Sequence, residues 1–496
     1  MSLTVTNTLS GEREQFEPQD PESVLLYYCG LTVSDDAHLG HARSWVHVDV
    51  MHRWLSHLGY DVRHVENFTD VNEKIVARIG PEGPGDTEEE VAAHYITSVI
   101  EDMRGLNLLR AEVYPRVSEH VPEIIDLIET LIERDYAYES NGSVYFDVSR
   151  FEGYGSLSNQ SLDEMEAQGQ ESEIEEKRRP EDFALWKAGP VDAHAIAEHR
   201  DESPDALPIS TGGQTWDSPW GEGRPGWHIE CSAMSMNHLD DTIDLHVGGQ
   251  DLVFPHHENE IAQSEAATGQ EFVRYWLHVS LLETEGEKMS TSLENFFTVS
   301  NALEEFGVNP IRMFLLSSSY RRPQTYSQRT LDEAVERWER LERAYRRTVE
   351  AADSPDAYTK VESGTLRQAI VAARESFTEA MNDDFNTREA IAALLELATA
   401  VNAHLDDVNE YDYRGLRRVI ETFEELGGEV LGFLFGERES HGEVSLAAEL
   451  VDLILEVREA EREAGNYERA DRLRDDLEAL GIEVQDTDTG PEFRLP

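Results

Sequence analysis

The sequence predicts an α/β protein in which a parallel sheet is split by an inserted domain and followed by a helical bundle and a small C-terminal domain. Two short apolar runs, 24–28 and 62–65, flank a helical pattern whose apolar side carries Trp45, Val48, Met51, Leu55 and Leu58. Strand, turn, helix and strand in this order form a βαβ unit, from which nucleotide-binding sheets are built. Strand patterns return at 243–247 and 272–282, so a separate domain is expected between the two halves of the sheet. From about residue 331 onward the pattern is mostly helical.

The inserted segment, about 114–220, has a secondary-structure pattern of its own. An amphipathic stretch has its apolar residues at Ile124, Leu127, Ile128, Leu131 and Ile132. Downstream, Asn141-Gly142 predicts a hairpin turn.

The helical part contains recognisable helix ends. Asn386 is expected to cap a helix, with Glu389 three residues later completing a capping box. A final helix, about 467–480, ends before Gly481. Its apolar stripe consists of Ala470, Leu473, Leu477 and Leu480.

The charge of the chain is strongly negative. Lys and Arg number 42, and Asp and Glu number 101, which gives a formal net charge of −59 over 496 residues. Such a surface repels itself and any polyanionic partner, and at about 1 M salt a Debye length of about 3 Å removes most of this repulsion. Because the acids are spread along the whole chain, we interpret them as a hydrated surface adapted to molar salt. An acidic protein from a low-salt cell is the alternative.

The cysteine count and the hydropathy pattern indicate the compartment. Cys29 and Cys231 are the two cysteines, too few for the disulfide framework of a secreted protein. No basic N-terminal region precedes an apolar core, and no run of about twenty apolar residues occurs. We therefore expect a cytoplasmic protein without membrane contact. A monomer is also expected.

His38-Leu39-Gly40-His41 lies where the first strand passes into the first helix. Backbone N–H groups and the positive end of a helix favour a phosphate there, and glycine permits close approach. Two histidines three residues apart can both face a triphosphate and stabilise charge in a transition state. Taken alone, the four residues also fit a chance pair of surface histidines.

A second polar motif, 287–292, follows far downstream. Lys288 and the hydroxyls of Ser290 and Ser292, in a loop with Gly286, can bind a departing pyrophosphate. Without further context, an exposed turn explains the same residues.

The two cysteines and a histidine-rich helix offer ligands for a metal. His256 and Glu260 are four residues apart, hence on one helix face, and both can bind zinc. Cys29 and Cys231 complete a ligand set only if the fold brings them to that helix. Two buried structural cysteines beside a solvated helix are the alternative.

Taken together, these motifs and their surroundings resemble one family, the cysteinyl-tRNA synthetases of class I, whose HIGH and KMSKS signatures match 38–41 and 288–292. The resemblance extends nearly from end to end. It rests on YYCGLTVSDDAHLGHAR (27–43), ENFTDVNEKI (66–75), GRPGWHIECSAM (223–234), FPHHENEIAQS (254–264), MNDDFNTREA (381–390) and NYERADRLRDDLEALGIEVQDTDTG (466–490).

The resemblance implies a function and a set of site residues. It implies a ligase that activates L-cysteine with ATP and Mg²⁺, releases pyrophosphate and transfers the cysteine to tRNA(Cys). His38, His41 and Lys288 would be catalytic, and Thr32 and Trp227 would line the amino-acid pocket. One zinc ion would be held by Cys29, Cys231, His256 and Glu260, with the substrate thiol as a further ligand. The groups implied to bind ATP or adenylate are Gly40, His246, Gly248, Gly249, Asp251, Ser290 and Ser292.

The same resemblance implies a domain plan with a Rossmann-like catalytic core. The core would occupy 1–114 and 221–270, with the inserted connective domain at 115–220 between its halves. The signature-loop and stem-contact region would follow at 271–330, a tRNA-binding helical bundle at 331–435 and an anticodon-recognition domain at 436–496.

The sequence departs from the family at Thr291, where the second signature lysine is expected. The segment 187–213 is also longer than expected, and no function is assigned to it. Two other functions stay open: a paralogue that joins cysteine to an amino sugar, and a non-catalytic RNA-binding zinc protein. Retention of 466–490 disfavours the first, and only Thr291 supports the second.

Overall fold

The computed structural model describes residues 2–80, 83–161, 175–200, 211–284, 287–288 and 297–436, and part of the segment 451–494. Two compact units are present, Met1–Phe435 and Gly436–Pro496. Each is described by itself below.

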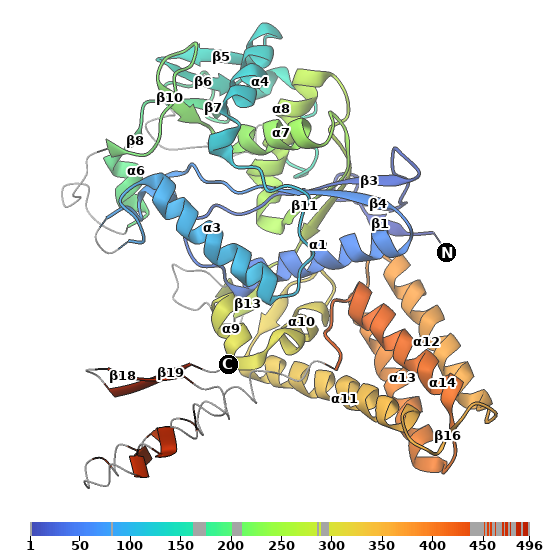
Figure 1. The fold of residues 1–496 in the computed structure, drawn as a ribbon. Helices are drawn as coiled ribbons and strands as arrows, with labels where there is room; N and C mark the ends of the chain where they lie inside the picture. The colour runs from blue at the N-terminus through green and yellow to red at the C-terminus, as the bar shows by residue number, and fades with distance from the viewer. Residues whose placement is uncertain are drawn as a thin grey trace. The chain divides into compact units, whose positions relative to one another are not determined.

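The centre of the first unit is a four-stranded parallel sheet with the order β12-β11-β3-β4 (Figure 1). Its strands are β3 (Ser23–Tyr28), β4 (Asp61–Glu66), β11 (Ile243–Gly249) and β12 (Val273–Val279). The buried strands are rich in Val, Leu and Tyr, as expected for a parallel sheet covered on both faces. The prediction of an α/β fold with a split parallel sheet is confirmed.

Helix α1 (Leu39–His57) connects β3 to β4. The predicted apolar side is buried at Trp45, Val48, Met51 and Leu55. Leu58 was expected on that side and is instead 39% exposed, because it is the C-cap beyond the last helical turn. Helix α3 (Glu88–Gly105) begins at Thr87, whose side chain accepts a hydrogen bond from the Glu90 N–H.

The inserted domain is a second, antiparallel sheet with the order β10-β7-β6-β5. Its strands are β5 (Ala137–Ser140), β6 (Ser143–Phe146), β7 (Phe183–Ala188) and β10 (Gly223–Pro225), and α4 (Val121–Glu133) packs beside them. The hairpin predicted at Asn141-Gly142 is present, with φ of 53° and 86° at the two turn residues.

The core of the inserted domain is shared with two helices that follow it in the chain, α7 (Trp227–His238) and α8 (Glu258–Thr268). Ile229, Met234 and Ala262 belong to the same apolar cluster as Val144 and Phe183. The inserted domain therefore packs directly on the elements that carry the candidate metal ligands. In the long segment 187–213, α6 (Ala193–Glu198) packs on Val76, and residues 201–210 lie outside the described part.

A small sheet of order β14-β13-β15 follows the parallel sheet in the chain. It consists of β13 (Leu282–Thr284), β14 (Glu287–Lys288) and β15 (Gln324–Tyr326), and α9 (Val299–Phe306) and α10 (Val308–Leu316) lie between β14 and β15 in the chain. The single strand pattern expected at 272–282 is thus divided between β12 and β13.

The helical bundle consists of α11 (Gln328–Ala352), α12 (Gly364–Asn382), α13 (Thr387–Asp407) and α14 (Tyr413–Thr422), continued by the π-helical turn η8 (Phe423–Val430). Asn386 caps α13 by accepting the Glu389 N–H at 3.3 Å, as predicted. Among the described contacts, the reciprocal hydrogen bond of a capping box is not formed.

The turn before α13 ties the bundle to the N-terminus. Asp384 has a φ of 62° and accepts hydrogen bonds from the Thr6 N–H and hydroxyl at 2.8 and 2.7 Å. It also accepts one from the Tyr320 hydroxyl at 2.8 Å. The motif 381–390 therefore joins the bundle to the first strand and to the segment that follows α10.

The second unit contains the hairpin β18 (Glu483–Thr487) and β19 (Gly490–Arg494). The predicted final helix lies partly outside the described residues; within it, Ala470 and Leu477 are buried as expected.

The first unit also contains shorter elements: β1 (Thr4–Thr6), β2 (Arg13–Gln15), α2 (Glu73–Val76), η1 (Val117–Glu119), η2 (Val148–Arg150), β8 (Val191–Asp192), β9 (Thr211–Gly212), η5 (Gln250–Leu252), η6 (Val253–His257), β16 (Ala357–Tyr358) and β17 (Tyr411–Asp412).

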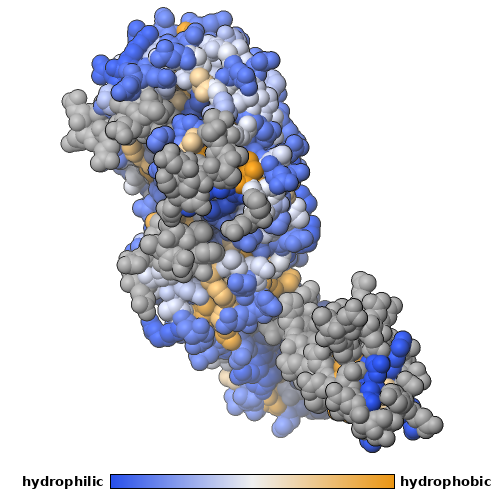
Figure 2. Space-filling view, turned by 90° about the vertical axis from the view of Figure 1, so that its left-hand side faces the viewer, coloured by the Kyte–Doolittle hydropathy of each residue, from blue (hydrophilic) through white to orange (hydrophobic). Residues whose placement is uncertain are grey.

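The face of the molecule drawn in Figure 2 is mainly hydrophilic. On the face in Figure 2, apolar residues appear as small separate spots among polar side chains. Among the described helices, none combines the length and the apolar character needed to cross a bilayer.

Candidate active site and metal centre

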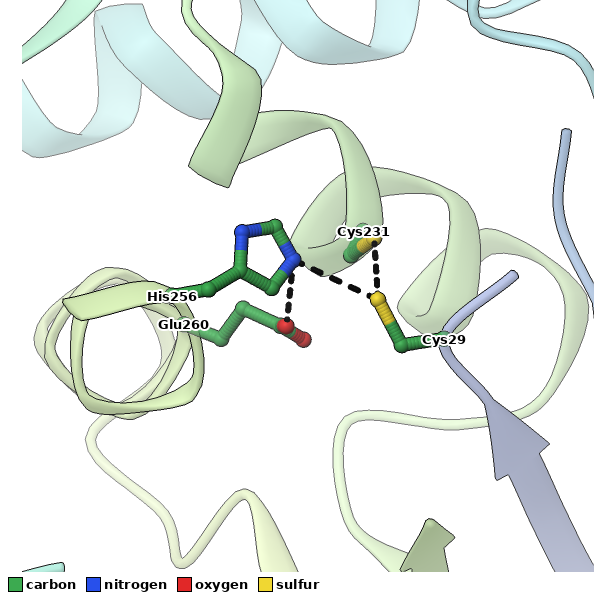
Figure 3. Close-up of side chains that lie close together, drawn as sticks. All are labelled: Cys29, Cys231, His256 and Glu260. Atoms are coloured by element: carbon green, nitrogen blue, oxygen red, sulfur yellow. Dashed lines mark hydrogen bonds and ion pairs between the residues drawn. The ribbon is translucent and has the colours of Figure 1, made fainter. Parts of the chain in front are cut away.

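Four potential metal ligands from distant parts of the chain meet in one buried cluster (Figure 3). Cys29 follows the last residue of β3, Cys231 lies on α7, His256 is in the turn before α8, and Glu260 lies in its first turn. The Cys29 Sγ lies 3.5 Å from the Cys231 Sγ and 3.4 Å from the His256 Nε2. The His256 Nε2 lies 3.1 Å from the Glu260 Oε1. The fold therefore brings Cys29 and Cys231 to the helix that carries His256 and Glu260, which the sequence alone left open.

The donor set fits a zinc ion. Zinc–ligand bonds of about 2.0–2.3 Å in a tetrahedron separate ligand atoms by roughly 3.3–3.8 Å, close to the observed spacings. The Glu260 carboxylate is fully buried, and a metal ion between the four ligand atoms would balance its charge. Two thiols with a histidine suit zinc better than a hard cation such as Mg²⁺.

A second group of buried side chains, His246, His257 and Glu260, also lies within metal-ligand spacing. It shares Glu260 with the first group. We favour the first group, because it contains both thiols and because the Glu260 Oε2 is already engaged by the His246 Nε2 at 2.9 Å.

Burial and mutual contact shift the pKa values of the ligands. The pKa of Cys231 is well above that of an ordinary thiol, because its hydrogen bond to Cys29 and its burial both favour the protonated form. Burial alone lowers the pKa of His256, but hydrogen bonds and charge from Cys231 and Glu260 raise it to about 10. For Glu260, burial raises the pKa, and the charge and hydrogen bonds of His246 and His256 outweigh burial and lower it to about 2. A metal ion would therefore displace protons from this cluster.

Three further polar side chains orient the cluster, and none of them was predicted to have this role. The His228 Nδ1 lies 2.9 Å from the His256 Nδ1. The Asn67 Oδ1 accepts hydrogen bonds from the Gly30 N–H at 2.9 Å and the Tyr27 hydroxyl at 3.0 Å. Their only signal was their position inside the motifs GRPGWHIECSAM and ENFTDVNEKI.

The third orienting side chain is His246, which was expected to bind adenylate. Its ring is fully buried and stacks on Trp276 at 4.4 Å between ring centroids. Its Nε2 contacts the Glu260 carboxylate at 2.9 Å. The side chain therefore faces the metal cluster.

His257 and Glu258, which were not assigned as ligands, have other partners. The His257 Nδ1 lies 2.8 Å from the His278 Nε2. The Glu258 carboxylate accepts hydrogen bonds from the Gly155 and Ser158 N–H groups, both at 2.8 Å. Glu258 thus fastens a loop of the inserted domain to the start of α8.

The predicted pocket residues lie close to the cluster. Trp227 is 38% exposed, and its ring centroid is 4.4 Å from that of His256, so Trp227 is not a core aromatic. Thr32 is half-buried in the loop after Cys29 and bridges to the backbone of Thr69. Gly30, which lies between Cys29 and Thr32 in the chain, is closely packed, because an added Cβ would lie 1.8 Å from the Asn67 carbonyl oxygen.

The histidines of the first motif are at the N-terminus of α1. His38 is the N-cap residue, and its Nδ1 accepts the Gly40 N–H at 3.0 Å. The rings of His38 and His41 stack with centroids 3.8 Å apart. Both side chains are thus held at the positive end of the helix, where an anion is favoured.

The loop 246–251 consists of the last residues of β11 and the start of the 3-10 turn η5, at the carboxyl edge of the sheet. Gly248 faces the His257 ring so closely that an added Cβ would lie 2.4 Å from it. Gly249 is next to Asp251, which is exposed. The carboxyl edge of a parallel sheet is the usual binding place for a nucleotide.

Only the backbone of Lys288 is described, paired with Glu283 at the end of β14. Ser290, Thr291 and Ser292 lie outside the described residues. Lys288 is therefore the one residue of the motif 288–292 whose position is described.

The split parallel sheet, with a histidine pair at its first helix and an inserted domain, defines a class I aminoacyl-tRNA synthetase. The family model "tRNA synthetases class I (C) catalytic domain" matches residues 15–336. A DALR domain matches 376–435, and a cysteinyl-tRNA ligase anticodon-binding domain matches 447–494. The solved structure of Mycobacterium tuberculosis methionyl-tRNA synthetase bound by methionyl-adenylate shares the fold, with a TM-score of 0.61, 14% identity, and coverage of 85% of this chain and 93% of that one.

The chain belongs to the cysteine–tRNA ligases. It is 68% identical over 498 residues to the cysteine–tRNA ligase of Haloarcula marismortui and 64% identical over 496 residues to that of Halobacterium salinarum. Each alignment covers 100% of both chains. The chain is therefore an aminoacyl-tRNA ligase of protein biosynthesis, as predicted, and these two relatives are enzymes of halophiles. The match at 447–494 favours this function over the amino-sugar ligase.

Proposed function

We propose that Cys29, Cys231, His256 and Glu260 bind one zinc ion that recognises the thiol of L-cysteine. The observation that carries this proposal is the convergence of two thiols, an imidazole and a carboxylate within 4.8 Å of one another in a buried site. When bound, zinc would hold the substrate sulfur as a thiolate ligand, which the harder hydroxyl of serine cannot match. Losing a specific contact of this kind discriminates better than resizing an apolar pocket.

We propose that the side chains around this metal site orient the metal ligands and the substrate. His228 and His246 hold the rings and carboxylate of the ligand set, which replaces the adenylate-binding role first predicted for the His246 side chain. Trp227 and Thr32 line the amino-acid pocket, with the Trp227 ring over His256. Asn67 fixes the backbone that follows Cys29.

For activation, the cysteine carboxylate attacks the α-phosphorus of ATP and pyrophosphate leaves. His38 and His41 at the start of α1, with Lys288, stabilise the charge that develops on the phosphates. Gly40, Gly248 and Gly249 allow close approach of the nucleotide, and Asp251 binds its ribose. Ser290 and Ser292 contact the pyrophosphate, and Mg²⁺ accompanies it. The terminal ribose hydroxyl of tRNA(Cys) then attacks the adenylate.

We further propose that tRNA contacts α14 of the bundle. Arg414, Arg417 and Arg418 are exposed on this helix, and no carboxylate of the described residues lies within 4.0 Å of them. Exposed Tyr358 and Tyr413 lie beside them, since β16 and β17 pair at this end of the bundle. Arg321, by contrast, lies 3.7 Å from Asp384 and is partly neutralised. Unpaired arginines interleaved with aromatic rings suit a nucleic-acid backbone.

The test is amino-acid-dependent ATP–pyrophosphate exchange, with charging of tRNA(Cys), at molar KCl. Wild-type protein should use cysteine and discriminate strongly against serine. Cys231→Ser should lose most of its zinc and raise the KM for cysteine at least about tenfold. Ser232→Ala, a neighbouring buried substitution on α7, should retain zinc. Normal zinc content and a normal KM in Cys231→Ser would refute the zinc assignment.

A further inference from the structure

Arg43 is a completely buried arginine two residues after His41 on α1. No carboxylate of the described residues lies within ion-pair distance of its guanidinium, although the chain contains 101 acidic residues. A buried, unpaired charge is costly unless its donors are all satisfied. The neutral partners of Arg43 must therefore account for its place in the core.

All five N–H donors of Arg43 meet oxygen acceptors. The Nε donates to the Ser280 carbonyl at 3.0 Å, and the Nη2 donates to the carbonyls of Ser319 and Arg322, both at 2.9 Å. The Nη1 donates to the Leu315 carbonyl at 3.3 Å and to the Gln324 side chain. Leu315 is in the last turn of α10, where free carbonyls form the negative end of the helix dipole and stabilise a cation.

These acceptors connect Arg43 to the strands that lead to Lys288. Gln324 is the first residue of β15, and its N–H donates to the Leu281 carbonyl at 3.1 Å. Strand β15 pairs with β13, and β13 pairs with β14, which ends at Lys288. The guanidinium thus joins α1, which begins with the histidine pair, to the small sheet that carries Lys288.

A further contact extends the network to the loop 246–251. The Ser280 hydroxyl donates to the Gln250 Oε1 at 2.7 Å, while the Ser280 carbonyl accepts from Arg43. Gln250 lies between Gly249 and Asp251, both proposed to bind the nucleotide. One side chain therefore contacts or adjoins all three segments of the ATP site.

We propose that Arg43 is a positioning residue for ATP activation, which holds α1, the β13–β15 pair and the loop 246–251 in one fixed arrangement. This role rests on the proposed function of those segments. Arginine is suited to it because its planar fork directs five donors outward, whereas lysine offers three donors from one point. Displacements of about 1 Å in a catalytic arrangement can reduce a rate about 100-fold.

The test compares Arg43→Lys with wild-type protein in cysteine-dependent ATP–pyrophosphate exchange, normalised to active sites counted by adenylate formation. Arg43→Lys should lower kcat at least about tenfold and raise the KM for ATP at least about threefold. The KM for cysteine should stay within about twofold and zinc content should be unchanged, because the metal cluster is not part of the network.

Arg312→Lys is the matched control. Arg312 is also fully buried and donates to backbone carbonyls, those of Leu106 and Leu431, as well as to Asp49. Of the three ATP segments, its partners include only α1, through Asp49 in the middle of the helix, and neither the β13–β15 pair nor the loop 246–251. Arg312→Lys should lower Tm about as much as Arg43→Lys does, yet its kcat per active site should stay within about twofold of the wild-type value.

Two results would overturn the role of Arg43: a folded Arg43→Lys with normal kcat and KM for ATP, or an equal loss of kcat in Arg312→Lys. If Arg43→Lys does not fold, Ser280→Ala tests the proposal instead, because it removes only the hydrogen bond from the Ser280 hydroxyl to Gln250. That variant should raise the KM for ATP at least about threefold, and an unchanged KM would overturn the proposal. Failure of wild-type protein to catalyse the exchange would instead refute the proposed function.

Discussion

At the scale of single residues, Glu66 at the end of β4 shows how burial affects stability. It is 4% exposed, and the Trp45 Nε1 donates to its Oε1 at 2.9 Å. It lines a small cavity with His52 and His64, and both nitrogens of His64 are without a partner among the described residues. Burial raises the pKa of Glu66 from its ordinary 4.5 to about 8.

This pKa predicts a pH-dependent cost that Glu66→Gln removes. Below about pH 4.5 the carboxyl is protonated in both states; between 4.5 and 8 the unfolded chain loses the proton that the folded state keeps. The free energy of unfolding therefore falls as the pH rises through this window. Glu66→Gln should raise Tm by several degrees at pH 8, where a shift of one pKa unit corresponds to about 1.4 kcal/mol, and much less at pH 5.

Thermal unfolding of both proteins at fixed molar KCl measures this difference. Glu89→Gln, an exposed substitution on α3, should leave the pH profile unchanged. A Glu66→Gln profile parallel to that of the wild type would contradict the role of the buried carboxyl.

At the scale of secondary-structure elements, α14 is the predicted RNA-binding helix. Its apolar side, Leu416, Val419 and Ile420, is buried in the bundle, and its arginines face outward. Other arginines of the bundle are paired, for example Arg374 with Glu425 at 2.7 Å. In so acidic a chain, three unpaired cations on one helix face provide a local site for phosphates.

The double substitution Arg417→Glu with Arg418→Glu should therefore raise the KM for tRNA(Cys) about tenfold or more in the charging assay. ATP–pyrophosphate exchange without tRNA should be unaffected, because α14 is not part of the activation site. Arg329→Glu is the control, since Arg329 is 81% exposed on α11 but paired with Glu333. An equal rise of the KM for tRNA(Cys) in the double variant and in Arg329→Glu would indicate a general charge effect and contradict a specific site on α14.

The elements were more predictable than the site. Strands β3, β4 and β11 follow from runs of apolar residues, and the Asn141-Gly142 hairpin follows from a turn that needs positive φ. The metal ligands were placed only through the resemblance, because contact between Cys29 and Cys231 depends on how α7 packs behind the sheet. Asn67 and His228 gave no local signal, since a single amide or imidazole is equally common in loops and cores. His246 was assigned to the nucleotide through the resemblance alone, whereas its ring is fully buried and contacts the Glu260 carboxylate.

At the scale of the whole molecule, the net charge of −59 governs the conditions under which the fold is stable. Acidic side chains repel one another over distances that molar salt screens to about 3 Å. The full-length similarity to enzymes of Haloarcula and Halobacterium agrees with this interpretation.

Raising KCl from 0.1 to 2 M should therefore raise Tm by about 10 °C or more and increase charging activity. Sucrose of equal osmolality, which is excluded from protein surfaces but does not screen charge, should give a much smaller increase. An equal Tm in 0.1 and 2 M KCl would show that the acidic surface does not limit stability.

Zinc K-edge X-ray absorption of the purified protein tests the central claim, that four converging side chains hold an ion which takes the substrate's sulfur. Without substrate, the spectrum should show two sulfur ligands at about 2.3 Å and lighter ligands at about 2.0–2.2 Å. Addition of cysteine, and not of serine, should increase the number of sulfur ligands to three. A spectrum without sulfur, or one that cysteine leaves unchanged, would contradict this mechanism of selection.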